Sequence, residues 1–247
     1  MGADFVDGKP RACIWLQNVS QTDFMAVPTV AERVDRVRAM RLESSKAATR
    51  KKAETPWLFD EIRLPNTSRF LACPTVTSGK RKYIPLGLVD DELIPGNKLY
   101  FISDDSLYTF GVLSSLFHNA WTRAVAGRLK SDYNYSNTVV YNNFVWPQPT
   151  TDQRSTIERC SQAVLDARAA HEGRSLAQMY DGISPLPEGV SQSEAKKFHR
   201  REYDDLRAAH EALDAAVEAA YGVDFHGDEE KIVAHLFKLY AEKTGGK

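Results

Sequence analysis

The chain has 247 residues, of which 43% are hydrophobic and 10% are aromatic. This length and composition suit one large or two small folded domains and argue against a globally disordered protein. The formal net charge is −1, which excludes a uniformly basic nucleic-acid-binding protein but leaves room for one with a local basic face.

The cysteines and the N-terminal sequence indicate the cellular compartment. Cys13, Cys73 and Cys160 are far apart, and no CxxC or Cys/His pair has the spacing of a zinc site. We expect three small buried hydrophobic residues in a reducing cytoplasm. The first residues lack the basic and apolar regions of a signal peptide, and no apolar run approaches the roughly 20 residues that span a bilayer. We therefore expect a cytoplasmic protein without a membrane partner.

The first predicted elements are a short strand at residues 10–16 (PRACIWL) and a helix over residues 27–52. Pro28 and Thr29 open that helix, and its apolar residues recur near a period of 3.6. The helix is basic, since it carries eight Arg and Lys residues against three Asp and Glu residues. Such an excess is compatible with a solvated face and with a surface that binds phosphates.

Residues 57–102 alternate short β-branched and aromatic runs with Pro, Gly, Asn and Asp. This pattern predicts four or five strands with tight connections. Within it, residues 78–83 (SGKRKY) are expected to form a turn that carries three cations.

Residues 106–126 return to helical spacing. We expect Ser103 or Asp104 to cap the start of this helix and Gly127 to stop it. A polar segment follows, and then residues 138–147 (TVVYNNFVWP), which are typical of a strand.

After residue 149 the composition changes to Ala, Glu, Arg and Lys with helical periodicity. Thr150 or Thr151 can cap the first of these helices. Helices are predicted at residues 151–172, 193–221 and 228–242, with a Gly/Pro/Ser-rich loop at residues 181–193. The sequence therefore predicts an α+β fold, with a mixed α/β part and a short-stranded sheet over residues 1–148 and an all-helical part over residues 149–247.

Sequence signatures of catalysis are absent. The chain has no GxGxxG, GxxxxGK[ST], HExxH or GxSxG motif, and it lacks the glycine-rich loop that a methyltransferase cofactor needs after a strand. The acidic cluster of Asp90, Asp91 and Glu92 is better explained as a solvated turn than as the metal site of a nuclease.

The histidines are also expected to be structural. His118 belongs to an apolar helix face, which favours a place in the core. The four-residue spacing of His210 and Asp214 favours a hydrogen bond on a helix surface over a catalytic dyad. Surface positions are expected for His171, His199, His226 and His235.

Residues 121–147 concentrate cations, asparagines and aromatic residues, the groups that contact phosphates, base edges and base faces. If residues 130–136 are extended, alternate side chains share a face. One face would carry Lys130, Asp132, Asn134 and Ser136, and the other would carry Tyr133 and Tyr135. A plain polar loop that leads into a strand is the alternative.

The run over residues 113–147 (LSSLFHNAWTRAVAGRLKSDYNYSNTVVYNNFVWP) resembles the target-recognition region of MmeI-like restriction–modification proteins and their class I SAM-dependent DNA methyltransferase relatives. The likeness extends to PRACIWL, RVRAMR, FLACPTVTSGKRKYIPLGLV, VLDAR and SLAQMYD, in the same order. It covers nearly the whole chain, and the ordered series is more specific than any one motif.

In that family a recognition domain reads a short asymmetric DNA site, a helical C-terminal segment follows, and the nuclease and methyltransferase domains lie upstream. The resemblance implies a target-recognition domain over residues 1–148 and a helical C-terminal domain over residues 149–247, with no catalysis by this portion alone. The partners implied are double-stranded DNA and an upstream methyltransferase region, in the same chain or as a separate subunit. S-adenosyl-L-methionine would bind that region, whose target would be adenine N6, with or without DNA cleavage.

The implied contacts with DNA fall into two sets. Expected base-reading residues are Ser78, Lys80, Lys130, Asp132 and Asn134, because Lys suits guanine, Asn suits adenine and Asp suits the amino group of cytosine. Expected backbone contacts are Arg81, Lys82, Arg123 and Arg128. No metal or cofactor ligands are expected in this chain.

Two departures from the family pattern limit what can be transferred. The family often has Ser-Ser-Glu where this chain has Thr77, Ser78 and Gly79, so a contact made by that glutamate has no counterpart here. The connection after the SLAQMYD motif is also longer. The competing hypothesis is a helical protein-interaction module that docks a partner subunit without base contacts.

Overall fold

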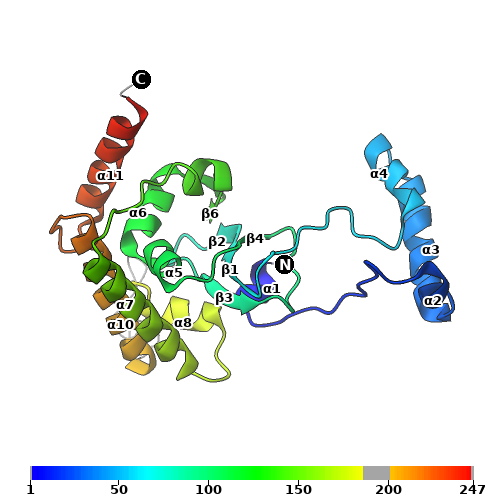
Figure 1. Cartoon of the computed structure of the whole chain (residues 1–247), viewed down its shortest axis with the longest axis horizontal. Helices are drawn as coiled ribbons and strands as arrows, with labels where there is room; N and C mark the ends of the chain where they lie inside the picture. Colours follow the sequence, from blue (N-terminus) through cyan, green and yellow to red (C-terminus); the bar gives the residue numbers. More distant parts are fainter. Residues whose placement is uncertain (1, 186–200, 246–247) are drawn as a thin grey trace. The chain divides into compact units, whose positions relative to one another are not determined.

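The computed structural model describes residues 2–185 and 201–245. The chain divides into two compact units, which are considered separately: Arg11–Arg63, and Met1–Pro10 together with Leu64–Lys247. Figure 1 shows the helices and the short strands along the chain. Two small antiparallel sheets accompany a larger helical content, so the predicted α+β class is confirmed.

The smaller unit is helical. It contains α2 (Gln21–Met25), α3 (Pro28–Leu42), α4 (Ala47–Lys51) and the 3-10 helix η1 (Lys52–Glu54). The single helix expected over residues 27–52 is wrong, because α3 ends at Leu42 and the chain turns before α4. The strand expected at residues 10–16 is also wrong. Instead of pairing in a sheet, this segment places the Trp15 ring against Phe59, with 5.5 Å between centroids.

A buried arginine organises the smaller unit. The Arg41 guanidinium donates to three carbonyl oxygens, those of Lys52 and Leu58 at 2.7 Å each and that of Thr55 at 3.0 Å. Only 8% of Arg41 is exposed. It therefore ties α3 to the segment after α4 and is not a free cation.

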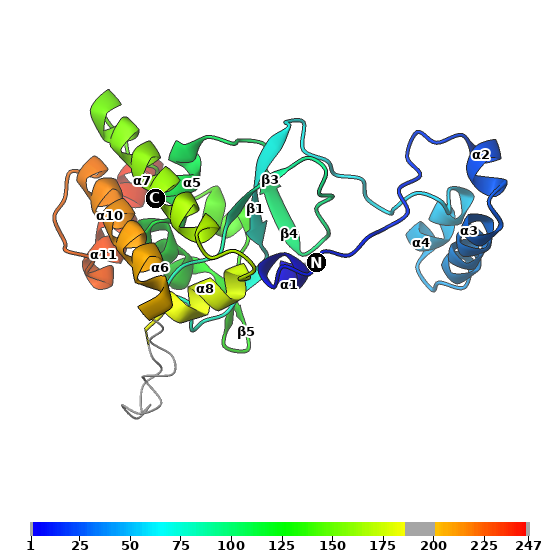
Figure 2. The same cartoon turned by 90° about the horizontal axis from the view of Figure 1, so that it is seen from below.

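The described part of the larger unit contains two three-stranded antiparallel sheets. The first has the order β3 (Gly87–Asp90), β1 (Arg69–Pro74) and β4 (Leu99–Ile102), and the second has the order β2 (Val76–Thr77), β6 (Asp132–Asn134) and β5 (Gly127–Leu129). Helix α1 (Gly2–Val6) packs against β1, as Figure 2 shows. The predicted strands are thus found from residue 69 onward, but residues 59–65 form none.

The segment between the sheets and the C-terminal helices differs from prediction in two places. The expected helix over residues 106–126 is split at Ser115 into α5 (Leu107–Ser114) and α6 (Leu116–Val125). Ser106, rather than Ser103 or Asp104, caps α5. The expected strand at residues 138–147 is instead the π-helix η2 (Asn137–Tyr141), whose start is capped by Ser136.

Four longer helices lie among the described residues after Pro149. They are α7 (Thr151–Ala169), α8 (Leu176–Ile183), α10 (Asp204–Ala220) and α11 (Glu229–Thr244), with the short 3-10 helix η3 (Arg201–Tyr203) before α10. The predicted cap at Thr150 is confirmed and forms a complete capping box with Gln153. Helix α8 covers the start of the loop expected at residues 181–193, and the rest of that loop after residue 185 lies outside the described residues.

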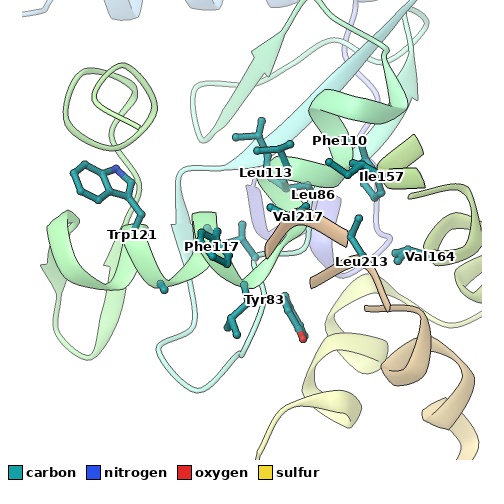
Figure 3. Close-up of a cluster of buried hydrophobic side chains, with 14 of the residues drawn as sticks. Tyr83, Leu86, Phe110, Leu113, Phe117, Trp121, Ile157, Val164, Leu213 and Val217 are labelled. Atoms are coloured by element: carbon teal, nitrogen blue, oxygen red, sulfur yellow. The ribbon is translucent and has the colours of Figure 1, made fainter. Parts of the chain in front are cut away.

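These helices and the preceding residues share one hydrophobic core. Figure 3 shows its centre, where side chains from α5 and α6 meet those of α7 and α10. The labelled members are Tyr83, Leu86, Phe110, Leu113, Phe117, Trp121, Ile157, Val164, Leu213 and Val217. No boundary between the compact units therefore falls at residue 148. The division into residues 1–148 and 149–247 stays a proposal about function.

Buried hydrogen bonds cross this core. The Asp214 carboxylate accepts from the Tyr83 hydroxyl and from the Leu116 N–H, each at 2.7 Å. His210 Nε2 lies 2.8 Å from the Tyr180 hydroxyl. The predicted surface hydrogen bond between His210 and Asp214 is therefore wrong, because both side chains are buried and each has its own tertiary partner.

Other histidine and cysteine predictions have mixed outcomes. His118 is buried, as predicted. His226 is exposed, but His171 and His235 are half-buried, and His199 lies outside the described residues. All three cysteines are free thiols, although only Cys73 is buried; Cys13 is exposed and Cys160 is half-buried.

Candidate nucleic-acid interface

The second sheet joins two segments that are far apart in the sequence. Val76 of β2 lies opposite Asn134 of β6, and Thr77 lies opposite Tyr133. Because β2 ends at Thr77, the turn that starts at Ser78 leaves the sheet beside the β5–β6 hairpin. The expected base-reading residues thus come from neighbouring parts of one ribbon, which we call the β2–β6–β5 ribbon (residues 76–80 and 127–134).

The two faces of this ribbon differ in burial. Thr77 and Tyr133 are buried, whereas Asn134 is exposed and Asp132 is half-buried. Tyr135, the next alternate residue, is also buried. Side chains along a strand alternate between faces, so the predicted separation of Asp132 and Asn134 from the two tyrosines is confirmed.

Two other residues depart from that alternation. Lys130 lies in the hairpin turn with a φ of 58°, in the left-handed region, so it is exposed but does not belong to the strand. Ser136 lies after β6, and its hydroxyl accepts from the Val139 N–H to cap η2. The prediction that both share the strand face with Asp132 and Asn134 is therefore wrong.

The turn after β2 rests closely on the hairpin. The Gly79 N–H donates to Asp132 Oδ1 at 3.4 Å. A Cβ atom at position 79 would lie 2.3 Å from the carbonyl oxygen of Ser131, closer than two such atoms can approach. The comparison with the family pattern indicates only that a glutamate is missing here. The Ser-Gly pair behind a β-branched run was the available signal for a tight approach.

The expected backbone contacts at Arg128 and Lys82 lie near aromatic rings. The Arg128 guanidinium stands over the Tyr133 ring at 4.3 Å and donates to the hydroxyl of that tyrosine at 3.2 Å. Arg128 is nevertheless exposed. Lys82 is half-buried, and its Nζ lies 5.2 Å from the centre of the Tyr83 ring.

The other two expected backbone contacts are bound within the protein. Arg81 forms an ion pair with Asp181 at 2.7 Å, and its side chain is 14% exposed. Arg123 forms an ion pair with Glu229 at 2.9 Å and also donates to the Lys82 carbonyl oxygen at 2.8 Å. These pairs hold the cationic turn against α8 and α6 against α11.

A buried histidine anchors the end of the hairpin. His118 Nε2 on α6 lies 2.9 Å from the Tyr135 hydroxyl, and the Tyr135 N–H donates to the Thr75 carbonyl oxygen at 2.9 Å. Burial lowers the pKa of His118 to about 3, so this imidazole is neutral at physiological pH. The ribbon is thereby attached to the core by neutral hydrogen bonds.

The predicted basic helix retains part of its charge at the surface of the smaller unit. Arg41 is buried, Arg36 pairs with Glu32, and Lys52 pairs with Asp60. Arg50 donates to two carbonyl oxygens. The charged side chains of four exposed residues make no hydrogen bond or ion pair within the described residues: Arg33, Arg38, Lys46 and Lys51.

The described residues offer neither a metal cluster nor a membrane span. No group of three or more His, Cys, Asp or Glu side chains among them is arranged to hold a metal ion. Asp90 forms an ion pair with Arg69 at 3.4 Å. Across residues 2–185 and 201–245, no helix combines the length and apolar character that crossing a membrane requires.

Comparison with known proteins shows to which protein family the chain belongs. Residues 1–148 match the sequence profile of the domain described as "MmeI, target recognition domain". The chain belongs to the MmeI target recognition domain family. Its expected family membership is therefore confirmed.

Two relatives extend the match past residue 148. DNA methyltransferase A of Bacillus subtilis (strain 168) is 36% identical over 242 residues, which is 98% of this chain but 25% of that protein. A solved structure of the Type IIL restriction–modification enzyme MmeI in complex with DNA has a TM-score of 0.87 and 36% identity, over 99% of this chain and 30% of the other. The chain thus spans less than a third of the length of either relative.

Proposed function

We propose that this chain reads the DNA target sequence for a DNA methyltransferase or a combined restriction–modification enzyme. The observation that carries the proposal is the β2–β6–β5 ribbon, which gathers predicted base-reading residues, each exposed or half-buried, in one part of a chain from this family. The likeness to a protein solved in complex with DNA supports it. The ribbon's β5–β6 hairpin is a two-stranded element, of the size that the DNA major groove admits.

We assign base contacts to the polar groups of the ribbon. Asn134 has the donor and acceptor that adenine requires, Asp132 can accept from the amino group of cytosine, and lysines suit guanine. The residues in this set are Ser78, Lys80, Lys130, Asp132 and Asn134. The Asp132 carboxylate keeps one oxygen for such a contact, since the Gly79 N–H donates to the other.

The four cations that we expected to contact the DNA backbone divide into two pairs. Arg128 and Lys82 are proposed to contact phosphates, because neither side chain is in an ion pair within the described residues. Arg81 and Arg123 are proposed to act by positioning the turn, since carboxylates already neutralise them. The exposed cations of α3 and α4 in the smaller unit are a further source of phosphate contacts.

The rest of the parent protein would supply the chemistry. We propose that residues 1–148 form the reading domain and residues 149–247 its helical support. S-adenosyl-L-methionine would bind another region, which would methylate adenine N6 in the cytoplasm. The competing idea of a helical docking module loses its main support, because the apolar stripe of α10, including Leu206, Leu213 and Val217, is buried in the core of this chain.

Selection from a randomised DNA duplex library tests the proposal. The 247-residue chain should enrich one short asymmetric sequence. Asn134→Ala should relax or change the selected base at one position, at a cost of about 1–3 kcal/mol in discrimination. Asn142→Ala, which removes an exposed asparagine outside the ribbon, should leave the selected sequence unchanged. The proposal would be wrong if no sequence were enriched or if both variants selected the wild-type sequence.

A further inference from the structure

Leu129, at the end of β5, is 59% exposed and is the most exposed large hydrophobic residue in the described part of the chain. A single exposed leucine is ordinary on a protein surface. Its position in the ribbon, rather than its exposure, distinguishes Leu129 from other exposed leucines such as Leu42.

The hairpin register places Leu129 beside the proposed reading residues. Leu129 lies directly opposite Asp132, and Gly127 lies opposite Asn134. Residues directly opposite each other in an antiparallel pair project to the same face. Leu129 therefore shares the outer face with Asp132 and Asn134, while Arg128 covers Tyr133 on the inner face.

This outer face is not covered by neighbouring groups at Gly127, and the turn at its end packs closely against Gly79. A Cβ atom added at Gly127, two residues before Leu129, would meet nothing within 4 Å, so no neighbouring group covers that part of the strand. On the other side, Gly79 packs closely against the Ser131 carbonyl group in the turn that follows Leu129. An apolar side chain is thus presented at a defined place among polar ones.

The chemistry of base edges limits what such a side chain can recognise. The C5-methyl group of thymine is the apolar group on the major-groove edge of the standard base pairs, and aliphatic side chains contact it. We propose that Leu129 is a specificity-determining residue that contacts the C5-methyl group of a thymine next to the base pair read by Asp132. This inference rests on the proposed function of the ribbon.

Uracil substitution tests the contact because it removes only the methyl group. The duplex selected by the wild-type chain is prepared with each thymine replaced in turn by deoxyuridine, and binding of the 247-residue chain is measured. At one position the loss of the methyl group should weaken wild-type binding about fourfold, as expected for one buried methyl-sized group. Leu129→Ala should bind the thymine and uracil duplexes equally, whereas Leu129→Met should retain a preference for thymine.

Leu42→Ala is the matched control, since Leu42 is 58% exposed and lies on α3. It should keep the wild-type response to uracil. The inference is wrong if uracil at no position weakens wild-type binding, or if Leu129→Ala still binds the uracil duplex more weakly than the thymine duplex. It is also wrong if Leu129→Ala weakens binding to the thymine and uracil duplexes by the same factor, as loss of a wedge between base steps would. Failure to select any sequence would instead reject the proposed function, and the inference with it.

Discussion

The Gly79 N–H points at the Asp132 carboxylate, with 3.4 Å between the nitrogen and Oδ1. These two residues are 53 positions apart in the sequence, yet they join the turn after β2 to the tip of the β5–β6 hairpin. The contact uses one oxygen of a proposed base-reading side chain. It therefore links the conformation of the turn to the orientation of Asp132.

Replacement of Gly79 by alanine should loosen the hairpin. The new Cβ atom would lie 2.3 Å from a backbone carbonyl oxygen, that of Ser131, so the turn and hairpin must separate. We expect a local cost of about 1–3 kcal/mol, as for an overpacked site. Amide hydrogen exchange of residues 127–134 should become about tenfold faster or more, and specific DNA binding should fall with it.

Gly127→Ala is the control for that experiment, because its Cβ atom has free space. Hydrogen exchange in residues 127–134 should stay close to that of the wild type. Equal exchange rates in the Gly79 and Gly127 variants would show that the close approach at Ser131 does not hold the hairpin.

The site was predictable from sequence where the cause is local. The separation of Asp132 and Asn134 from Tyr133 requires only an extended backbone, whose side chains alternate. The pairing of β2 with β6 depends on tertiary folding, so the Ser-Gly pair can signal a tight approach at Gly79 but not that Ser131 is the residue it meets. The left-handed turn at Lys130 was missed because the alternation was extended past the end of the strand.

In the fold too, features with a local cause were predictable from sequence and those set by tertiary contacts were not. The cap at Thr150 was predicted correctly because a capping box is a local arrangement within four residues. Residues 138–147 alternate like a strand, but a hydroxyl of Ser136 starts η2, and Trp121 donates to the Val140 carbonyl oxygen at 3.0 Å. The i, i+4 spacing of His210 and Asp214 was real, but burial gave each side chain a partner on another element.

Arg128 and Arg123 should respond differently to loss of charge. Arg128 is exposed and proposed to contact a phosphate, so Arg128→Ala should reduce the slope of log K against log salt by about one unit. Arg123 is paired with Glu229 and bound to the Lys82 carbonyl oxygen, so Arg123→Ala should leave that slope unchanged and lower the free energy of unfolding. Binding titrations at several salt concentrations, with urea unfolding of both variants, measure the two effects.

The result would contradict the assignment if the salt slopes of the two variants were reversed. A wild-type slope in Arg128→Ala would mean that this guanidinium serves only to cover Tyr133. Arg128→Lys helps to separate charge from shape, because it keeps the cation but loses the planar group that stacks on the ring. That variant should keep the wild-type salt slope.

Arg41 should be essential to the smaller unit. Arg41→Met keeps most of the apolar stem but leaves three carbonyl oxygens, on Lys52, Thr55 and Leu58, without their donor. Each buried carbonyl oxygen that is left without a donor costs about 1–3 kcal/mol. Limited proteolysis should then cut within residues 11–63 faster than in the wild type, whereas Arg38→Met, at an exposed position on the same helix, should not change the rate. Equal cleavage of the two variants would show that Arg41 does not hold this unit together.

The stability of the larger unit should depend on pH through three buried groups. Burial lowers the pKa of His118 to about 3 and that of His210 well below 6.5, so both stay neutral in the folded state. In the unfolded chain they take up protons below about pH 6.5. The unfolded state therefore binds more protons, and the free energy of unfolding should fall on acidification by up to about 1.4 kcal/mol per pH unit for each histidine.

Asp214 opposes that trend. Burial raises its pKa from 3.8 to about 6, so between about pH 6 and pH 4 the folded state binds a proton that the unfolded state does not. This offsets one of the two histidine contributions in that range. Asp214→Asn removes the offset, while the amide can still accept from the Leu116 N–H and donate to the Tyr83 hydroxyl oxygen. Urea unfolding at pH 7, 6, 5 and 4.5 should show a steeper loss of stability in Asp214→Asn than in the wild type below pH 6, and parallel curves there would mean that Asp214 is ionised throughout.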